Sequence, residues 1–266
     1  MLLNFDHLGW WKYVLLTITI LAAAFLLLPI FFIAALSLGS SQWLIFPPPG
    51  WTLQWYRELL ADPRWLESAW TSFKIASIVT VLSVLLGLVT SFGLVRGTFL
   101  FRDALKALFL TPMILPVVVL AVGLYAFFLR VGLGGTLAGF VISHLVLALP
   151  FSILSISSAL EGFDRSIEDA AILCGASPLE ARIRVTLPAI SHGIFSAAVF
   201  SFLTSWDEVV VAIFMASPTL QTLPVKVWAT LRQDLTPVVA AASTLLILLT
   251  ILLMALVALA RKVLKS

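Results

Sequence analysis

The chain has 266 residues, of which 61% are hydrophobic and only 11% are charged, and its formal net charge is +3. A soluble domain carries roughly 45–50% apolar and about 25% charged residues, so a soluble fold of this length would leave much apolar surface in water. The small basic excess gives no indication of a nucleic-acid partner, and the single cysteine, Cys174, excludes an intrachain disulfide framework and a cysteine-cluster metal site.

Six apolar runs are each long enough to cross a membrane, which takes about 20 residues of helix. Because lipid offers no water to satisfy backbone groups, we expect all six to be helices. The predicted fold class is an all-α integral membrane protein with six transmembrane helices, forming one transmembrane domain over residues 1–266. Pro112, Pro116 and Pro150 are expected to kink or break their helices. The runs are Tyr13–Leu38, Ile75–Val95, Ala107–Leu129, Thr136–Ala159, Ile190–Ala216 and Val238–Ala260.

Basic residues in the short loops favour an orientation with both termini in the cytoplasm. That orientation places ten lysines and arginines inside and six outside, as the positive-inside rule prefers. Arg261, Lys262 and Lys265 near the C-terminus make the clearest single contribution. The same orientation puts the loop between the fourth and fifth runs, about residues 160–189, in the cytoplasm.

The first outer loop is rich in aromatic residues. Trp51, Trp55 and Leu59 are spaced four apart, so on a helix they would share one face. Such a helix would suit the membrane interface, where Trp and Tyr gather in an aromatic belt. The alternative is a docking surface for a partner on the outside.

The loop at 160–189 has the signals of two short helices. Ser166 followed by Asp169 resembles a capping box, and Gly175 marks a natural helix end. Ser177–Glu180 then supplies a serine N-cap, a proline at the first helical position and a glutamate at the third. Pro188 is expected to close this second helix before the fifth run. We therefore predict a helix–turn–helix. The loop is also much longer than a passive connector, which would need only a few residues.

One face of the first loop helix is apolar, with Ile167, Ala170, Ala171 and Cys174 at helical spacing. An apolar stripe on a charged loop favours a surface that docks into a groove on another protein. The alternative is that the two small helices pack on the underside of the chain's own membrane domain.

Two adjacent acids, Asp207 and Glu208, stand in the fifth run, roughly 25 Å from its cytoplasmic end if the helix is continuous. An acid at the centre of a span costs about 2.5–3.5 kcal/mol, so two are not expected to face lipid. On a helix they lie about 100° apart, and at least one can face a cavity. They are candidates for an anionic path that attracts ammonium groups, with Trp206 adding a cation–π surface. The alternatives are placement at the outer interface or an ion pair with a partner's base or with Arg130, Lys226 or Arg232.

The loop's spacing resembles the EAA loop of ABC-type importer permeases. Asp169-Ala170-Ala171 is followed by Gly175, then by Val185 and Leu187-Pro188 at the family's intervals, and the one departure is Asp169, where the family usually has Glu. The resemblance implies a coupling helix that sits in a cleft of a cytoplasmic ATPase. The candidate coupling residues are Glu168, Asp169, Ala170, Ala171, Gly175, Leu187 and Pro188.

Other segments are similar to the spermidine/putrescine permease branch, specifically its second, shorter subunit. They include Phe46–Tyr56, Gly162–Asp164, Ser205–Glu208 and Thr222–Val225. The resemblance implies a multi-pass protein of the bacterial plasma membrane that moves a polyamine inward by alternating access. It also implies four kinds of partner: two copies of an ATP-binding subunit, a sister permease, a periplasmic or extracellular substrate-binding protein, and membrane lipid.

Catalytic signatures are missing from the sequence. There is no Gly-x-x-x-x-Gly-Lys-Ser/Thr loop, so we expect the chain to be no enzyme and to bind no cofactor, with ATP used by the partner ATPase. His7, His144 and His192 are too scattered to suggest a metal site.

Several functional alternatives stay open. Related permeases carry other small cationic or amine solutes, and a self-contained channel or secondary transporter would use the acids but would not need the coupling loop. An intramembrane enzyme would require a nucleophile–base pair or a metal set inside the spans, and none is apparent.

Overall fold

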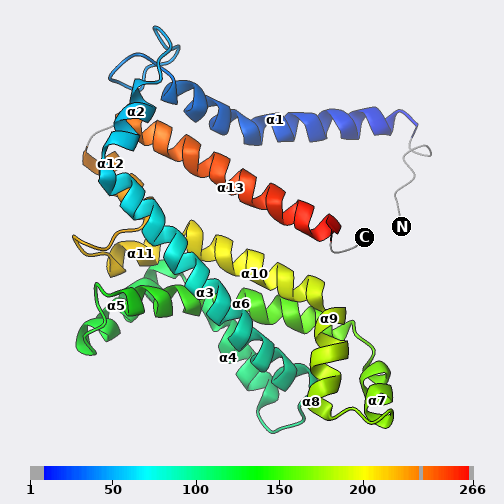
Figure 1. Ribbon diagram of the computed structural model, residues 1–266. Coiled ribbons are helices and arrows are strands. Elements are labelled where there is room, and N and C mark those ends of the chain that lie inside the picture. The colour runs from blue at the N-terminus through cyan, green and yellow to red at the C-terminus, as the bar shows by residue number, and fades with distance from the viewer. Residues whose placement is uncertain (1–8, 234–235, 264–266) are drawn as a thin grey trace. The chain divides into compact units, whose positions relative to one another are not determined.

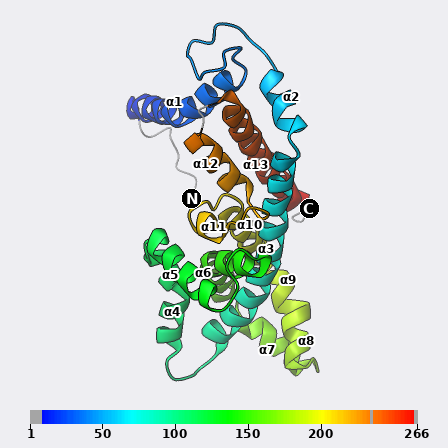
Figure 2. The same cartoon turned by 90° about the vertical axis from the view of Figure 1, so that its left-hand side faces the viewer.

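The computed structural model describes residues 9–233 and 236–263, and helices make up nearly all of these ranges (Figures 1 and 2). Within them the extended pairings are isolated bridges, Gly39 with Trp51 and Ser217 with Leu220. The all-α fold class is thereby confirmed. The chain divides into two compact units, one of Met1–Pro63 with Ala229–Leu256 and one of Arg64–Trp228 with Val257–Ser266.

The first unit holds α1 (Trp11–Ser37), α2 (Gln54–Ala61) and most of α13 (Pro237–Val263). The central part of α1 buries no residue, which suits a helix whose apolar side chains face lipid. Polar contacts fasten the loop that follows it. The hydroxyls of Ser37 and Tyr56 lie 2.7 Å apart, and the indole N–H of Trp55 donates to the carbonyl of Gly39 at 2.6 Å.

The predicted helix in the first outer loop is present, but its aromatic face is smaller than expected. Trp55 and Leu59 are buried on α2, whereas Trp51 lies before the helix and is 69% exposed. The bridge to Gly39 holds Trp51 in an extended segment, so the prediction that it shares a helix face with Trp55 was wrong. Trp55 serves the packing of the loop itself, through its bond to Gly39.

The second unit is built around α3, α6 and α10, with the short helices α7–α9 together at one end (Figures 1 and 2). Its helices are α3 (Pro63–Arg96), α4 (Arg102–Ile114), α5 (Val117–Arg130), α6 (Leu137–Glu161), α7 (Arg165–Leu173), α8 (Pro178–Ala181), the π-helix η2 (Arg182–Thr186), α9 (Leu187–Ala189), α10 (Ser191–Trp206), α11 (Val210–Met215) and the start of α12 (Leu223–Gln233).

Small residues let α3, α6 and α10 approach closely. A Cβ added at Gly87 of α3 would lie 2.8 Å from the Cβ of Ser152 on α6, and one at Gly193 of α10 would overlap Ala159. Membrane helices commonly associate through such small residues, because lipid tails leave no hydrophobic drive for helices to pair.

Three buried serines join the same helices. The hydroxyl of Ser83 on α3 donates to that of Ser152 on α6 at 2.8 Å, and Ser201 on α10 lies 2.8 Å from Ser152 and 3.0 Å from Ser83. Hydrogen bonds between membrane helices average about 0.6 kcal/mol each, so the cluster adds a modest stabilisation and fixes the relative rotation of the helices.

Helices coincide with the six apolar runs, but the count of six spans is not confirmed. In the described residues three helices are long and apolar enough to cross a membrane alone, α1, α3 and α6. Two bent pairs raise that number to five, α4 with α5 at 104° and Pro178–Ala189 with α10 at 71°. Pro116 caps α5 at the first break, as predicted, whereas α6 continues through Pro150 without interruption.

Candidate functional site

The first arm of the loop at residues 160–189 is α7, and its N-cap lies two residues before the predicted one. Asp164 is the N-cap, and its Oδ1 accepts from the backbone N–H of Ser166 at 2.9 Å. The prediction of Ser166 as N-cap was therefore wrong, because the aspartate two residues earlier reaches the free N–H groups first. The hydrogen bond from that N–H, helped by the Ser166 hydroxyl, holds the pKa of Asp164 below its usual value.

Gly175 ends α7 as expected. Its φ is +100°, a left-handed conformation that side chains disfavour. The N–H of Gly175 donates to Ile172 at 2.9 Å and the N–H of Ala176 donates to Ala171 at 3.1 Å. These two bonds form a Schellman motif, which satisfies the last carbonyls of the helix.

The predicted capping box at Ser177 is confirmed. Ser177 Oγ accepts from the N–H of Glu180 at 3.3 Å, and Glu180 Oε2 accepts from the N–H of Ser177 at 3.0 Å. The latter bond, with the Ser177 hydroxyl, lowers the pKa of Glu180. The second arm of the loop consists of α8, η2 and α9 and ends at Ala189. At the end of η2 the N–H of Leu187 donates to the carbonyl of Arg182, five residues earlier. This wider turn accommodates Pro188, which has no N–H to donate.

Several apolar side chains on this loop are exposed. Leu173 is 89% exposed and Leu179 is 64% exposed, and about half of Ile167 and of Ile183 is also open. Within the described residues, Ile167 and Leu173 of α7 are left uncovered, which favours a docking surface over packing on the chain's own underside for this helix. Of the predicted coupling residues, Asp169, Ala170, Gly175 and Pro188 are exposed, and Ala171 and Leu187 are half-buried.

Glu168 differs from the other predicted coupling residues, because it is only 7% exposed. Its Oε2 accepts from the hydroxyl of Thr186 at 2.9 Å, and its Oε1 lies 3.4 Å from Nε of Arg182. The carboxylate of this candidate coupling residue thus turns toward the second arm of the loop and not outward. Asp169 faces outward and forms a loose pair with Arg165 at 4.0 Å.

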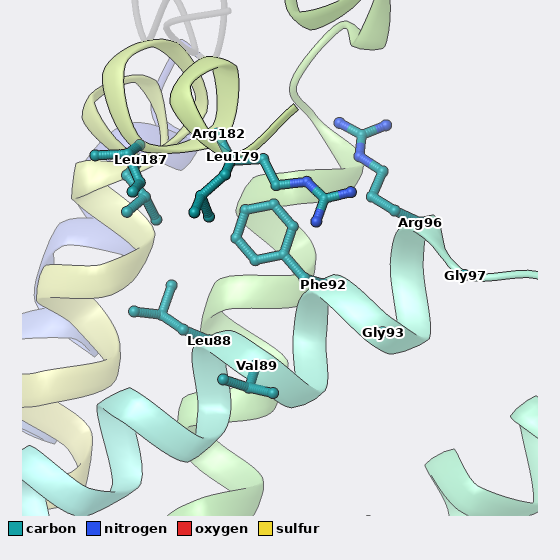
Figure 3. A pocket seen from close by; sticks show the side chains of 10 residues that line it. Leu88, Val89, Phe92, Gly93, Arg96, Gly97, Leu179, Arg182 and Leu187 are labelled. Atoms are coloured by element: carbon teal, nitrogen blue, oxygen red, sulfur yellow. The ribbon is translucent and has the colours of Figure 1, made fainter. Parts of the chain in front are cut away.

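A pocket of about 500 Å³ separates the second arm from the end of α3 (Figure 3). The guanidinium of Arg182 lies over the ring of Phe92, 5.8 Å from its centroid. Leu179, Ile183 and Leu187 form the loop side of the pocket. The second arm of the loop is thus in contact with α3 as well as with the first arm.

The fifth apolar run is broken at the two acids. Helix α10 ends at Trp206 and α11 begins at Val210, so Asp207 and Glu208 lie in a non-helical step and not on one helix at 100°. Glu208 is half-buried, and its Oε1 accepts from the N–H of Val211 at 2.8 Å. The physical reason for the difference is this bond, since a carboxylate that binds a free N–H at a helix start stabilises a new helix there.

Asp207 is exposed and terminates α10, whose 16 residues span about 24 Å. The C-terminal end of a helix carries a partial negative charge, which adds to the charge of the carboxylate. Discontinuous membrane helices place such ends at ion and substrate sites, where a cation meets backbone oxygens. The step at Asp207 is therefore suited to a cationic group.

Trp206 does not provide the open cation–π surface that the sequence suggested. Its side chain is 1% exposed, and its ring stacks on Phe202 with centroids 5.7 Å apart. The indole is instead part of the buried core.

His144, to which the sequence assigned no role, makes a buried hydrogen bond to the end of α10. His144 on α6 is fully buried, and its Nδ1 lies 2.9 Å from the hydroxyl of Ser205, two residues before Asp207. His144 lies near the beginning of α6, whereas the loop at residues 160–189 follows the end of that helix, so the step and the loop belong to opposite ends of the second unit. His7 lies outside the described residues. Across the described ranges no three metal-ligating side chains come together.

The sequence that forms these helices, the capped loop and the broken helix matches a known protein family. Residues 83–265 match the family described as "binding-protein-dependent transport system inner membrane component". The chain belongs to this family. It is therefore a multi-pass inner-membrane permease of a binding-protein-dependent importer, and the resemblance found in the sequence is confirmed.

The relatives agree with that placement. The chain is 31% identical over 245 residues to the putrescine transport system permease protein PotI of Escherichia coli K12, covering 89% of this chain and 85% of PotI. It is 29% identical over 228 residues to the spermidine/putrescine transport system permease protein PotC of the same strain, covering 86% of each. A sulfoquinovosyl glycerol permease, SmoH of Agrobacterium fabrum, is 28% identical over 205 residues, covering 75% of this chain and 72% of SmoH.

The fold has a counterpart among solved structures. A chain from a bacterial ABC transporter involved in the import of the acidic polysaccharide alginate superposes with a TM-score of 0.68, covering 97% of this chain and 98% of that one at 18% identity. At that identity the likeness concerns the fold alone.

Proposed function

We propose that this permease is the second, shorter membrane subunit of an ATP-driven ABC importer that moves a polyamine such as spermidine or putrescine inward by alternating access. The observation that carries the proposal is the likeness to PotI and PotC, which extends over 85% or more of both chains in each pair. A relative named for sulfoquinovosyl glycerol belongs to the same group of matches, so the family alone does not fix the substrate.

The acidic step supports a cationic substrate. An exposed carboxylate at Asp207, at the negative end of α10, attracts an ammonium group more strongly as water is excluded. A neutral sugar glycoside gains nothing from that charge. The alternative that we keep is another small cationic or amine solute, which would use the same step.

The cytoplasmic loop supports an external source of energy. Its exposed apolar face suits a cleft in a cytoplasmic ATPase, and a self-contained transporter would not need such a surface. The assembly that we propose contains this chain, a sister permease, two copies of the ATP-binding subunit and an outside substrate-binding protein. Both termini lie in the cytoplasm, this chain binds no cofactor, and ATP is hydrolysed by the partner.

Uptake by sealed vesicles that contain the full complex tests this proposal. Labelled putrescine, spermidine, a small monoamine and a neutral sugar glycoside are offered in turn, with and without ATP. ATP-dependent accumulation of the polyamines alone is the expected result. Preference for the monoamine would support the alternative, and accumulation of the glycoside or uptake without the ATPase would contradict the proposal.

A further inference from the structure

The carboxylate of Glu168 on the coupling loop is buried, so it is not part of the exposed surface that would contact an ATPase. On α7 the neighbouring side chains of Arg165 and Asp169 are about 60% exposed, whereas the side chain of Glu168 between them is 9% exposed. Burying a carboxylate is costly unless it is paired and hydrogen-bonded. Glu168 therefore has to be matched by groups of the chain itself.

The groups that match Glu168 come from the other arm of the loop. Thr186 donates its hydroxyl at 2.9 Å and Arg182 lies at 3.4 Å, and these residues follow Glu168 by 18 and 14 positions. The backbone link between the arms is short and contains Gly175 in a left-handed conformation. The side-chain bonds of Glu168 thus tie the two arms directly, across a glycine turn.

One of the residues bound to Glu168 also contacts the membrane helix α3. Arg182 places its guanidinium over Phe92 near the end of α3 (Figure 3). Four residues further on, Arg96 donates through Nη2 to the carbonyls of Leu160 and Phe163 at 3.3 and 3.0 Å. The end of α3 is therefore bound by Arg96 to the segment just before α7, and it contacts the second arm through Phe92 and Arg182.

We propose that Glu168, Arg182 and Thr186 form a latch that makes the two arms one rigid body and transmits its displacement to α3 through Phe92. The proposal rests on the proposed function, because it assumes that an ATPase moves the loop. Glu168 is then a positioning residue: with the latch broken, a push on α7 is absorbed by rotation at Gly175 and does not reach α3.

The mobility of α7 can be measured at Cys174, the only cysteine of the chain, which is exposed at the end of that helix. We expect a nitroxide there to show a mobile component about tenfold larger in Glu168→Ala, since losing a buried charged partner costs enough to shift a local equilibrium by that factor. Thr186→Val, which keeps the side-chain shape, should give a smaller rise. The double variant should equal Glu168→Ala, because both changes break one network.

A matched control is Arg165→Gln, which breaks an exposed ion pair on the same helix and should leave the label unchanged. An unchanged spectrum in both Glu168→Ala and Thr186→Val would overturn the latch. The spectra are recorded on the permease without the ATPase, so they do not depend on docking.

A second measurement tests transmission in the full complex. With Glu168→Ala we expect the ATPase to stay bound and the amount of substrate moved per ATP hydrolysed to fall several-fold, with partial rescue by Glu168→Gln, which can still accept from Thr186. Wild-type yield per ATP in Glu168→Ala would overturn transmission through the latch. Failure of the wild-type permease to bind the ATPase would instead overturn the proposed function, and the pull-down shows that separately.

Discussion

The carboxylate of Glu208 accepts a hydrogen bond from the backbone N–H of Val211 at 2.8 Å, in the first turn of α11, which begins after a break of three residues from the end of α10. The two adjacent acids consequently have different tasks. Glu208 is half-buried and binds the backbone of α11, whereas Asp207 is exposed at the end of α10. A broken backbone at membrane depth is tolerated where it is buried in protein or lines a water-filled cavity.

Removing the hydrogen bond between Glu208 and the first turn of α11 should weaken this step without removing the charge at Asp207. We expect Glu208→Ala to destabilise the permease by about 1 kcal/mol, the usual loss when a helix cap is deleted. Glu208→Gln is the control, since its amide oxygen can still accept from Val211. The measurement is thermal stability of the purified complex. Equal stability of the alanine and glutamine variants would show that the bond to Val211 contributes nothing.

An arginine introduced at the end of α7 should weaken binding of the ATPase to the permease. We expect Ala171→Arg to weaken ATPase association by about tenfold or more, equal to roughly 1.4 kcal/mol, because the side chain clashes at a close contact. Gly175→Arg should do the same and also strain a residue at φ +100°. Ala171→Ser is the control for size. Pull-down and coupled transport that are unaltered in both arginine variants would refute the docking assignment.

The orientation can be read from the native cysteine. Cys174 is exposed on the loop that we assign to the cytoplasm, so an impermeant thiol reagent should label it from the cytoplasmic side alone. Cys174→Ser reports background labelling. Labelling restricted to the outside would reverse the predicted topology of both termini.

Acid should destabilise the two capped helices of the loop at residues 160–189. The pKa values of Asp164 and Glu180 are lowered by hydrogen bonds from the N–H groups of Ser166 and Ser177, so these caps contribute fully above the usual carboxyl values of 3.8 and 4.5. Their contribution is lost as the pH falls through the lower pKa values of the folded state. We expect a nitroxide at Cys174 to gain mobility between about pH 5 and pH 2.

A matched variant separates the two caps in that titration. Glu180→Gln retains an acceptor for the Ser177 N–H at every pH, so its titration should lose the part that comes from Glu180 and keep the part from Asp164. Identical curves for the wild type and this variant would contradict a role for the Glu180 charge.

Local signals in the sequence were sufficient for the helices and for the second arm of the loop. Ser177-Pro178-Leu179-Glu180 specifies its own cap, since every bond in it joins near neighbours, and Gly175 is a helix end for the same reason. Where two capping residues compete, as Asp164 and Ser166 do, the pattern alone did not choose correctly.

Contacts between distant residues could not be predicted in this way. Nothing in the sequence around Glu168 pairs it with Thr186, and a serine at position 83 gives no sign that it meets Ser152 and Ser201. The break at Asp207 was missed because an apolar run predicts a continuous helix, while the cap that interrupts it depends on the rotamer of one glutamate. Burial of Trp206 likewise depends on packing against Phe202.

The most direct test of a cationic path is the Asp207→Asn variant. The amide keeps nearly the same shape and removes the charge, so we expect uptake of a polyamine to fall by about tenfold or more while assembly and thermal stability of the complex stay at wild-type values. A structural ion pair predicts the opposite pattern, because the stranded base would destabilise the complex. Uptake, basal ATPase activity and thermal stability are measured on the same purified complex. Sharply reduced uptake with normal assembly is the result that the proposed mechanism predicts, and wild-type uptake or loss of assembly would contradict it.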